Sequence, residues 1–148
     1  MATQQRTILL VEPEPVLAEV TAFRLELLGY RVNCVPSGEA AMGEIGRAVP
    51  DLLITDLILP GLDGKGLIER LATDEATADL PIMVLSVDAD LAQVQTVFQL
   101  GATDFVVVPF HPEVLEEKVA KLLASAPVRA AAPPEQTTQT QEQAVAAK

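Results

Sequence analysis

The chain has 148 residues, the length of one ordinary domain with a short excess. Hydrophobic residues make up 49% and charged residues 21%, which excludes a wholly disordered chain. Acidic side chains outnumber basic ones by 21 to 10, and the net charge of −11 disfavours nucleic-acid or anionic membrane partners. The single cysteine excludes a disulfide framework, and no apolar run is long enough to span a membrane. We therefore expect a cytoplasmic, soluble protein.

The composition changes near residue 125. Residues 1–125 carry the whole net negative charge. Residues 126–148 are mainly Ala, Gln, Pro and Thr without an aromatic residue, and such a segment buries too little apolar area to offset the entropy of ordering it. The sequence predicts one domain over residues 1–125 and a disordered tail over 126–148, with a short helix over 135–148 as the alternative.

Short apolar runs mark the expected strands. Uninterrupted runs of this length are typical of strands covered on both faces, as in a parallel sheet. Four of them occur in chain order, at Ile8–Val11, Leu52–Ile54, Ile82–Leu85 and Phe105–Val108. The segment Arg31–Val35 is more polar and is predicted to be an edge strand.

Helical patterns fill the intervals between these runs. After the first run, apolar residues recur with helical spacing at Val16, Val20, Phe23 and Leu27. Gly29 follows and predicts the end of that helix. Ser37 is a candidate cap for a short second helix through Ile45, and Asp63 is the expected cap for a third over Gly64–Leu71.

Two more helices are predicted in the second half of the chain. The fourth carries apolar residues at Leu91, Val94 and Phe98, and it is expected to end at Gly101. The fifth begins at Pro112, a residue that suits a first helical position, with a stripe at Leu115, Val119 and Leu122.

Strand and helix signals thus alternate five times. Right-handed crossovers place the helices on both faces of the sheet, which predicts a doubly wound α/β domain of (βα)5 type. Ligands of such domains gather outside the carboxyl ends of the strands. The loops to inspect therefore begin at Glu12, Asp56, Ser86 and Val108.

The segments around these four positions resemble the response-regulator receiver (CheY-like) family of two-component signalling. The matching stretches are 8–15, 51–64, 81–86 and 101–110, and the most specific is the run from Asp56 through Leu-Pro-Gly-Leu-Asp-Gly. The resemblance implies a five-stranded parallel sheet in the flavodoxin-like order 2-1-3-4-5. It also implies a domain that accepts a phosphoryl group from a sensor histidine kinase or a phosphotransfer protein.

The resemblance assigns a role to each strand end. Asp56 is the implied phosphoacceptor, and Mg²⁺ is held by Glu12, Asp56 and the backbone carbonyl of Ile58. The Ser86 hydroxyl bonds the phosphoryl oxygens, and Phe105 matches the aromatic residue that changes rotamer in the switch. Adjacent carboxylates repel one another, and a hard divalent cation with oxygen ligands relieves that repulsion and admits an anionic phosphodonor.

Two positions depart from the family pattern. The family places two adjacent acids at the end of the first strand, whereas this chain has Glu12 followed by Pro13, which offers no side-chain ligand. The lysine expected before the proline of the fifth strand is Val108, which donates neither charge nor a hydrogen bond. We therefore expect weak Mg²⁺ binding and a weak response to phosphorylation.

Several of these residues also have a purely structural interpretation. Asp56 could be a loop acid, and Glu14 an acid at the start of the first helix, where the helix dipole favours it. Ser86 could cap the following turn, and Asp63 is expected to be a cap. Two further single residues are expected to be structural, with His111 capping the last helix and Cys34 lying in the core or at a sheet edge.

Three functions remain open from the sequence. The first is a working receiver whose output is docking to a downstream protein, through the last helix, the fifth strand and the helix before it. The second is a degenerate receiver that binds protein partners independently of phosphorylation. The third is a flavodoxin-like binder of a small molecule, although aromatic residues make up only 3% of the chain. A conventional enzyme is not expected, because one histidine and one cysteine leave no nucleophile and base pair.

Overall fold

The structure is a computed structural model that describes residues 5–125, so the predicted tail over 126–148 lies outside the described residues. The strands are β1 (Thr7–Val11), β2 (Arg31–Val35), β3 (Leu52–Asp56), β4 (Ile82–Ser86) and β5 (Asp104–Val107). The helices are α1 (Pro15–Leu27), α2 (Gly38–Arg47), α3 (Gly64–Thr73), α4 (Leu91–Leu100) and α5 (Pro112–Ser125). Strand and helix alternate throughout, as the sequence predicts.

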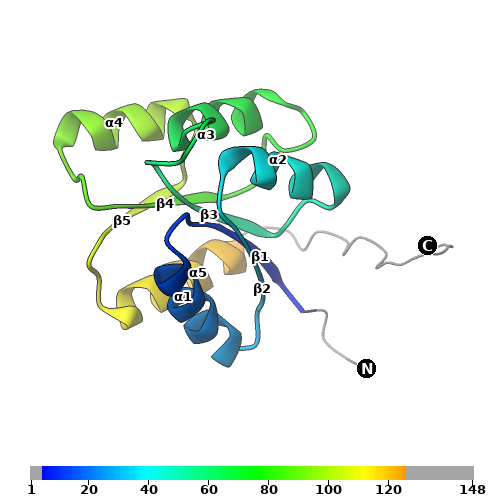
Figure 1. The fold of residues 1–148 in the computed structure, drawn as a ribbon, viewed down its shortest axis with the longest axis vertical. Helices are drawn as coiled ribbons and strands as arrows, with labels where there is room; N and C mark the ends of the chain where they lie inside the picture. Colours follow the sequence, from blue (N-terminus) through cyan, green and yellow to red (C-terminus); the bar gives the residue numbers. More distant parts are fainter. Residues whose placement is uncertain (1–4, 126–148) are drawn as a thin grey trace, which may run out of the picture.

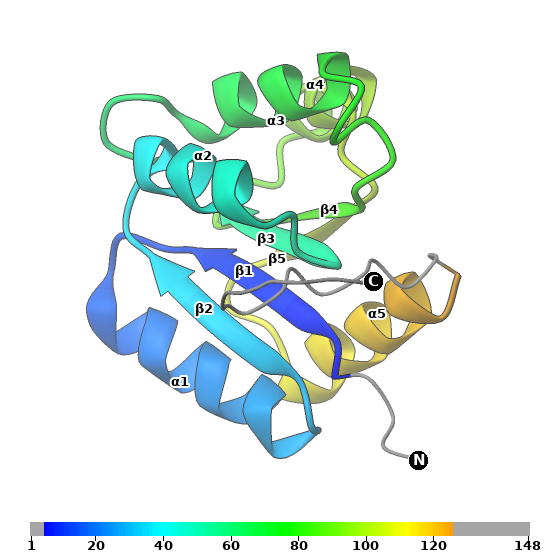
Figure 2. The same cartoon turned by 90° about the vertical axis from the view of Figure 1, so that its right-hand side faces the viewer.

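All five strands pair in parallel in one sheet, in the order β2-β1-β3-β4-β5. The strand Arg31–Val35 lies at one edge, which confirms that prediction. Helices α2, α3 and α4 cover one face of the sheet, and α1 and α5 cover the other (Figures 1 and 2). The doubly wound architecture and the order 2-1-3-4-5 are therefore confirmed.

The sheet separates two hydrophobic clusters. On the side of α2, α3 and α4, the strands contribute Leu9, Val11, Leu53, Ile82 and Val84. On the side of α1 and α5, they contribute Ile8, Leu10, Leu52, Ile54, Met83, Leu85 and Val106. Alternate residues of one strand thus enter opposite clusters, and burying each aliphatic side chain is worth roughly 1.5–3 kcal/mol. This two-sided burial explains why the strand sequences are uninterrupted apolar runs.

The predicted helix ends are confirmed by their hydrogen bonds. Ser37 Oγ accepts from the N–H of Ala40 at 3.1 Å, and Asp63 Oδ1 accepts from the N–H of Gly66 at 2.9 Å. Gly29, at φ 99°, follows α1 closely, and α4 is capped by a glycine at φ 130°. Both conformations are ones that residues other than glycine rarely adopt.

The helical spacing of α1 predicts the helix correctly but marks its solvent face. Side chains of that pattern are between 54% and 67% exposed, at Val16, Val20, Phe23 and Leu27. The face packed on the sheet is instead formed by Ala18, Thr21, Ala22 and Leu25. Small alanines let the helix backbone approach the sheet, and spacing alone does not decide which of two apolar faces is buried.

The same difference occurs in α4. Leu91 is 70% exposed and Phe98 is 42% exposed, whereas Val97 is fully buried. In α5 the predicted Leu115 and Val119 are buried, whereas Leu122 is half-buried and its neighbour Leu123 is the third buried residue. Within residues 5–125, no helix is both long and apolar enough to cross a membrane.

Candidate functional site

The four predicted strand ends meet at one edge of the sheet. Asp56 is the last residue of β3 and pairs with Leu85 of β4, directly before Ser86. Glu12 follows β1, the neighbour of β3 on the other side, and Val108 follows β5. Because all strands are parallel, their carboxyl ends share this edge.

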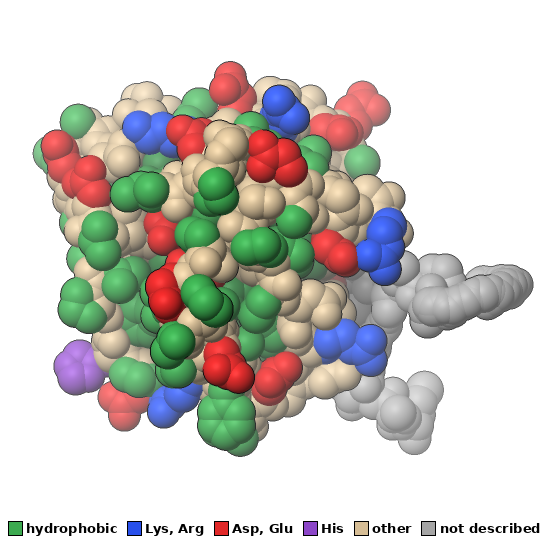
Figure 3. Space-filling model, in the orientation of Figure 1, with side chains coloured by type: hydrophobic (Ala, Val, Ile, Leu, Met, Phe, Trp, Pro, Cys, Tyr) green, Lys and Arg blue, Asp and Glu red, His purple; other side chains and the backbone are tan. Residues whose placement is uncertain are grey.

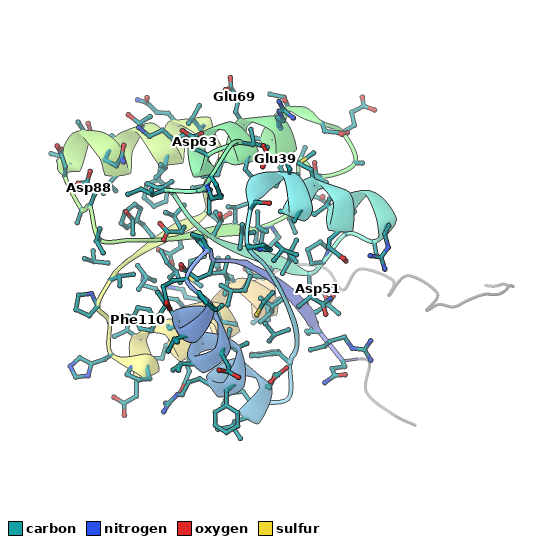
Figure 4. All side chains as sticks on the ribbon, viewed as in Figure 1. Glu39, Asp51, Asp63, Glu69, Asp88 and Phe110 are labelled. Atoms are coloured by element: carbon teal, nitrogen blue, oxygen red, sulfur yellow. The ribbon has the colours of Figure 1, made fainter. Side chains whose placement is uncertain are left out.

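Figure 4 labels an acidic residue near each of the two edges of the sheet. Asp51, just before β3, lies at the amino edge and is 3% exposed. Its carboxylate accepts from the N–H of Thr7 at 2.8 Å, so it holds the start of β1. Asp88, just after β4, lies toward the opposite edge, where the candidate site is.

Glu12 turns into this edge and is only 6% exposed. Its Oε2 accepts from the N–H of Glu14 at 3.1 Å. Burial raises the pKa of Glu12 above its usual value of 4.5; the Glu14 N–H opposes this shift, and the charges of Asp56 and Glu14 add to it. The charge of Asp56 thus acts on Glu12, so the two carboxylates lie at the same end of the sheet.

Asp56 is half-buried, and its carboxylate has a fixed orientation. Oδ1 accepts from the N–H of Ile58 at 3.2 Å. No hydrogen bond within residues 5–125 reaches Oδ2, so this oxygen remains open to a reacting group. Gly64 packs directly beneath, since a Cβ there would lie 2.5 Å from the carbonyl oxygen of Asp56. The acceptor position is therefore held by backbone contacts on both sides.

Ser86 caps the turn after β4, which is one of the two roles expected of it. It is 2% exposed, and its Oγ accepts from the N–H of Asp88 at 3.1 Å, which is the expected turn cap. Its hydroxyl proton has no acceptor among the described residues and is available at the edge where Asp56 lies. Phe105 is half-buried and packs against the cluster on the side of α2, α3 and α4.

Val108 lies where a cation would be expected, and no cation replaces it. Its side chain packs with Phe110 against the cluster on the side of α1 and α5. Its N–H donates to the carbonyl of Ser86 at 2.8 Å, and its peptide bond to Pro109 is cis. Within the described part of the chain no ion pair includes Asp56. The site is therefore a cluster of acids bordered by apolar side chains.

The remaining sequence candidates have structural roles. Glu14 caps α1 by accepting from the N–H of Leu17 at 2.8 Å. The His111 carbonyl accepts from the N–H of Val114 at 2.9 Å at the start of α5. Cys34 lies on the edge strand, where partial desolvation of its thiol beside α1, together with the charge of Glu26, raises its pKa. A raised pKa makes it a poor nucleophile.

Sequence reasoning missed Glu39, in the first turn of α2. Its Oε2 accepts from the N–H of Leu62, in the loop after Asp56, at 2.8 Å. The two residues are 23 positions apart, and an acid in a first helical turn is otherwise explained by the helix dipole. No local signal in the sequence identifies this contact.

Whether the site suits a divalent metal ion is decided by its oxygen donors. Within residues 5–125, no group of three or more His, Cys, Asp and Glu side chains could hold a metal ion. Two carboxylates, Glu12 and Asp56, are nevertheless close enough for the charge of one to raise the pKa of the other. A hard cation with oxygen ligands suits such a pair, but Pro13 supplies no third carboxylate. The donor set thus fits Mg²⁺, but it has one side-chain ligand fewer than a site with two adjacent acids after β1.

Comparison with known proteins yields one consistent family. Residues 8–120 match the family described as "Response regulator receiver domain". The chain is 34% identical over 116 residues to the "Probable transcriptional regulator ycf27" of Guillardia theta, covering 78% of this chain and 44% of that protein. The chain therefore spans about half the length of the curated relatives it matches.

Solved structures agree with this assignment. A response regulator from Chloroflexus aurantiacus J-10-fl is 36% identical and superposes with a TM-score of 0.78, over 82% of this chain and 99% of that one. The receiver domain of sensor histidine kinase PA1611 from Pseudomonas aeruginosa PAO1 is 30% identical with a TM-score of 0.76, over 82% of this chain and all of its own, and has magnesium coordinated in its active-site cleft. With the fold and the strand-end acids in place, the chain belongs to the response regulator receiver domain family of two-component signalling.

Proposed function

We propose that this domain accepts a phosphoryl group on Asp56 from a histidine kinase or a phosphotransfer protein, and that its output is docking to a downstream protein. The observation that carries the proposal is the fixed Asp56 carboxylate at the carboxyl edge. One oxygen is occupied by the Ile58 N–H, the other is open, and the hydroxyl of Ser86 lies on the neighbouring strand end. A carboxylate nucleophile with a nearby hydroxyl donor supplies two of the groups that phosphoryl transfer to an aspartate uses.

In the proposed step, a phosphoryl group passes from a histidine nitrogen to a carboxylate oxygen of Asp56. The free oxygen of Asp56 attacks the phosphorus of a phosphoimidazole, the P–N bond breaks, and the electron pair returns to the imidazole, which takes a proton from solvent. The product is an acyl phosphate on Asp56. The Ile58 N–H keeps the attacking carboxylate oriented, and the Ser86 hydroxyl donates to a phosphoryl oxygen.

The groups that would hold Mg²⁺ are the carboxylates of Glu12 and Asp56 and the backbone carbonyl of Ile58. A bound magnesium ion would supply the positive charge that lets an anionic donor approach two carboxylates. Pro13 removes one side-chain ligand and Val108 removes the second cation, so the affinity is expected to be low.

The phosphodonor is proposed to dock on the exposed face of α1, which begins three residues after Glu12. Its apolar side chains are Val16, Val20, Phe23 and Leu27. Figure 3 shows hydrophobic side chains open to solvent beside acidic ones on this part of the surface. A donor that delivers a phosphoryl group to the end of β3 must approach this region, and an apolar helix face flanked by basic residues would be complementary to it.

A phosphorylation-independent interaction module is the second candidate. It is favoured by Val108, whose half-buried side chain packs against the core and supplies no cation to Asp56. The small-molecule binder gains no comparable support. For both the phosphorylated receiver and the phosphorylation-independent module we propose a cytoplasmic location, where two-component receivers meet their kinases.

Mass spectrometry after incubation with acetyl phosphate and Mg²⁺ decides between the two. We expect one added phosphoryl group on the parent and none on Asp56→Asn. Asp63→Asn is the matched control: it removes the same charge from the same loop, and asparagine still caps α3. No phosphoryl adduct on the parent, under conditions that phosphorylate a receiver with two adjacent acids, would favour the phosphorylation-independent module.

A further inference from the structure

The loop between Asp56 and Gly64 is held in place at three points. At its start and middle, Leu57 and Leu59 are buried, at 4% and 8% exposed, while Ile58 between them is 69% exposed. At its end, the N–H of Gly64 donates to the carbonyl of Leu57 at 2.9 Å. The third point is the backbone of Leu62, whose half-buried side chain packs against the cluster on the side of α2, α3 and α4. This third point is supplied by another helix.

Helix α2 contacts the loop through Glu39 and Gly38. Glu39 Oε2 accepts from the N–H of Leu62 at 2.8 Å. Gly38 is buried, and a Cβ at this position would collide with the carbonyl oxygen of Leu62. Gly61 has φ 68°, and a Cβ there would collide with the Glu39 carboxylate. Two glycines therefore let the carboxylate and the loop backbone meet directly.

The start of α2 is itself fixed to the site. The N–H of Glu12 donates to the carbonyl of Val35, the last residue of β2, at 3.0 Å. Ser37 then caps α2, and Ala41 in the next turn is fully buried. In the sheet, β1 lies between β2 and β3. The bond from Glu39 to Leu62 thus joins the start of α2, which follows β2, to the loop that follows β3.

We propose that Glu39 is a positioning residue, which holds the 57–63 loop so that Asp56 and the Ile58 backbone present a preformed site. The inference rests on the proposed function, because the site is the proposed acceptor. It follows from the contacts: the bond to Glu39 holds Leu62, near the end of a loop whose Ile58 N–H orients the Asp56 carboxylate, so its loss loosens that loop. Since Pro13 and Val108 supply no ligand or charge, the site depends more heavily on the geometry of this loop.

The test compares Glu39→Ala and Glu39→Gln with Glu44→Ala. Glu44 lies on the same helix and bonds only Arg47 among the described residues, so its removal is a matched loss of one acid. A glutamine retains an oxygen that accepts from the Leu62 N–H but removes the charge near the start of α2, which separates the hydrogen bond from a helix-dipole effect. The measurements are amide exchange at Ile58 and Leu62 by NMR, Mg²⁺ affinity by calorimetry, and urea unfolding.

For Glu39→Ala we expect amide exchange at Ile58 and Leu62 to rise roughly tenfold and the Mg²⁺ dissociation constant to rise roughly threefold to tenfold. Glu44→Ala should stay within about twofold of the parent, and Glu39→Gln should restore most of both values. The proposal is overturned if Glu39→Ala and Glu44→Ala behave alike. It is equally overturned if amides throughout α5 exchange faster as well, because that shows a general loss of stability.

The two proposals fail in different measurements. A parent that binds no Mg²⁺ and accepts no phosphoryl group contradicts the proposed function. Exchange at Ile58 still decides the role of Glu39 in that case, because it reports the loop without any ligand. Faster exchange confined to the loop supports the positioning role, and unchanged exchange contradicts it.

Discussion

Glu12, a proposed Mg²⁺ ligand, is buried at a cost to the stability of the folded state. It is buried beside a second carboxylate, and its raised pKa shows that the folded state favours the protonated form. Between its ordinary value of 4.5 and the raised value, the folded protein binds more protons than the unfolded chain. Stability therefore falls as pH rises through this window, and the loss persists at neutral pH.

We expect Glu12→Gln to unfold at a higher urea concentration than the parent at about pH 7.5, in buffer with EDTA. The amide oxygen still accepts from the Glu14 N–H, while the buried charge is gone. The gain should disappear at about pH 4, where Glu12 is protonated in both states. Glu19→Gln, on the exposed face of α1, is the control and should show no gain. A parent as stable as Glu12→Gln at pH 7.5 would contradict the argument.

At the scale of the element, α1 is a helix with two apolar faces. One packs on the sheet through Leu25, which is fully buried, and the other is exposed through Phe23, at 59%. Arg24 lies between them and pairs with Glu116 of α5 at 2.7 Å. The stripe that predicts the helix is therefore open to solvent and available for the proposed docking, and the opposite face supplies the packing on the sheet.

This division predicts separate effects of two substitutions. Leu25→Ala should lower the free energy of unfolding by about 3 kcal/mol, because it leaves a cavity against the sheet. Phe23→Ser should change it by less than about 0.5 kcal/mol, because the ring is exposed and the two residues have similar helix propensity. Urea unfolding measures both, and donor-dependent phosphorylation measures whether Phe23→Ser weakens docking. A large loss of stability in Phe23→Ser would contradict the assignment of the two faces.

At the scale of the whole molecule, the position of Val108 determines how strongly phosphorylation changes the conformation. A cation at this strand end would form a charge-assisted hydrogen bond to the phosphoryl group, worth roughly 1.5–3 kcal/mol. That energy corresponds to about a tenfold to hundredfold shift of a two-state equilibrium. Val108 instead packs against the core with Phe110. The phosphorylated site thus lacks one of the forces that would draw the strand-end loops together.

We expect beryllofluoride with Mg²⁺ to shift NMR signals only near Asp56 in the parent. Val108→Lys, with Pro13→Asp to strengthen the metal site, should extend these shifts to Phe105 and β5. Val107→Lys is the matched control, because it adds the same charge one residue earlier, at a position that is 44% exposed. Extensive shifts in the parent, with Val108 intact, would falsify the weak-switch prediction.

The sequence by itself determined the features that depend on neighbours along the chain. Apolar runs located the strands, Ser37 and Asp63 marked the starts of α2 and α3, and Gly29 and Gly101 marked the ends of α1 and α4. These signals are local because a cap or a left-handed residue acts within one helical turn. The polar residues at the ends of the strands likewise placed Asp56, Glu12 and Ser86 at one edge, since parallel strands must end together.

Only the tertiary structure decided which surfaces meet. The more hydrophobic stripe of α1 lies in solvent, and close packing of the small residues Ala18 and Ala22 on the sheet decides which face is buried. The bond from Glu39 to Leu62 joins residues 23 positions apart. It requires Gly38, which lets α2 approach the carbonyl of Leu62, and Gly61, which lets the loop approach the Glu39 carboxylate. The sequence shows both glycines without showing what they approach. Contacts between distant residues depend on how whole elements pack, and local patterns carry no record of that packing.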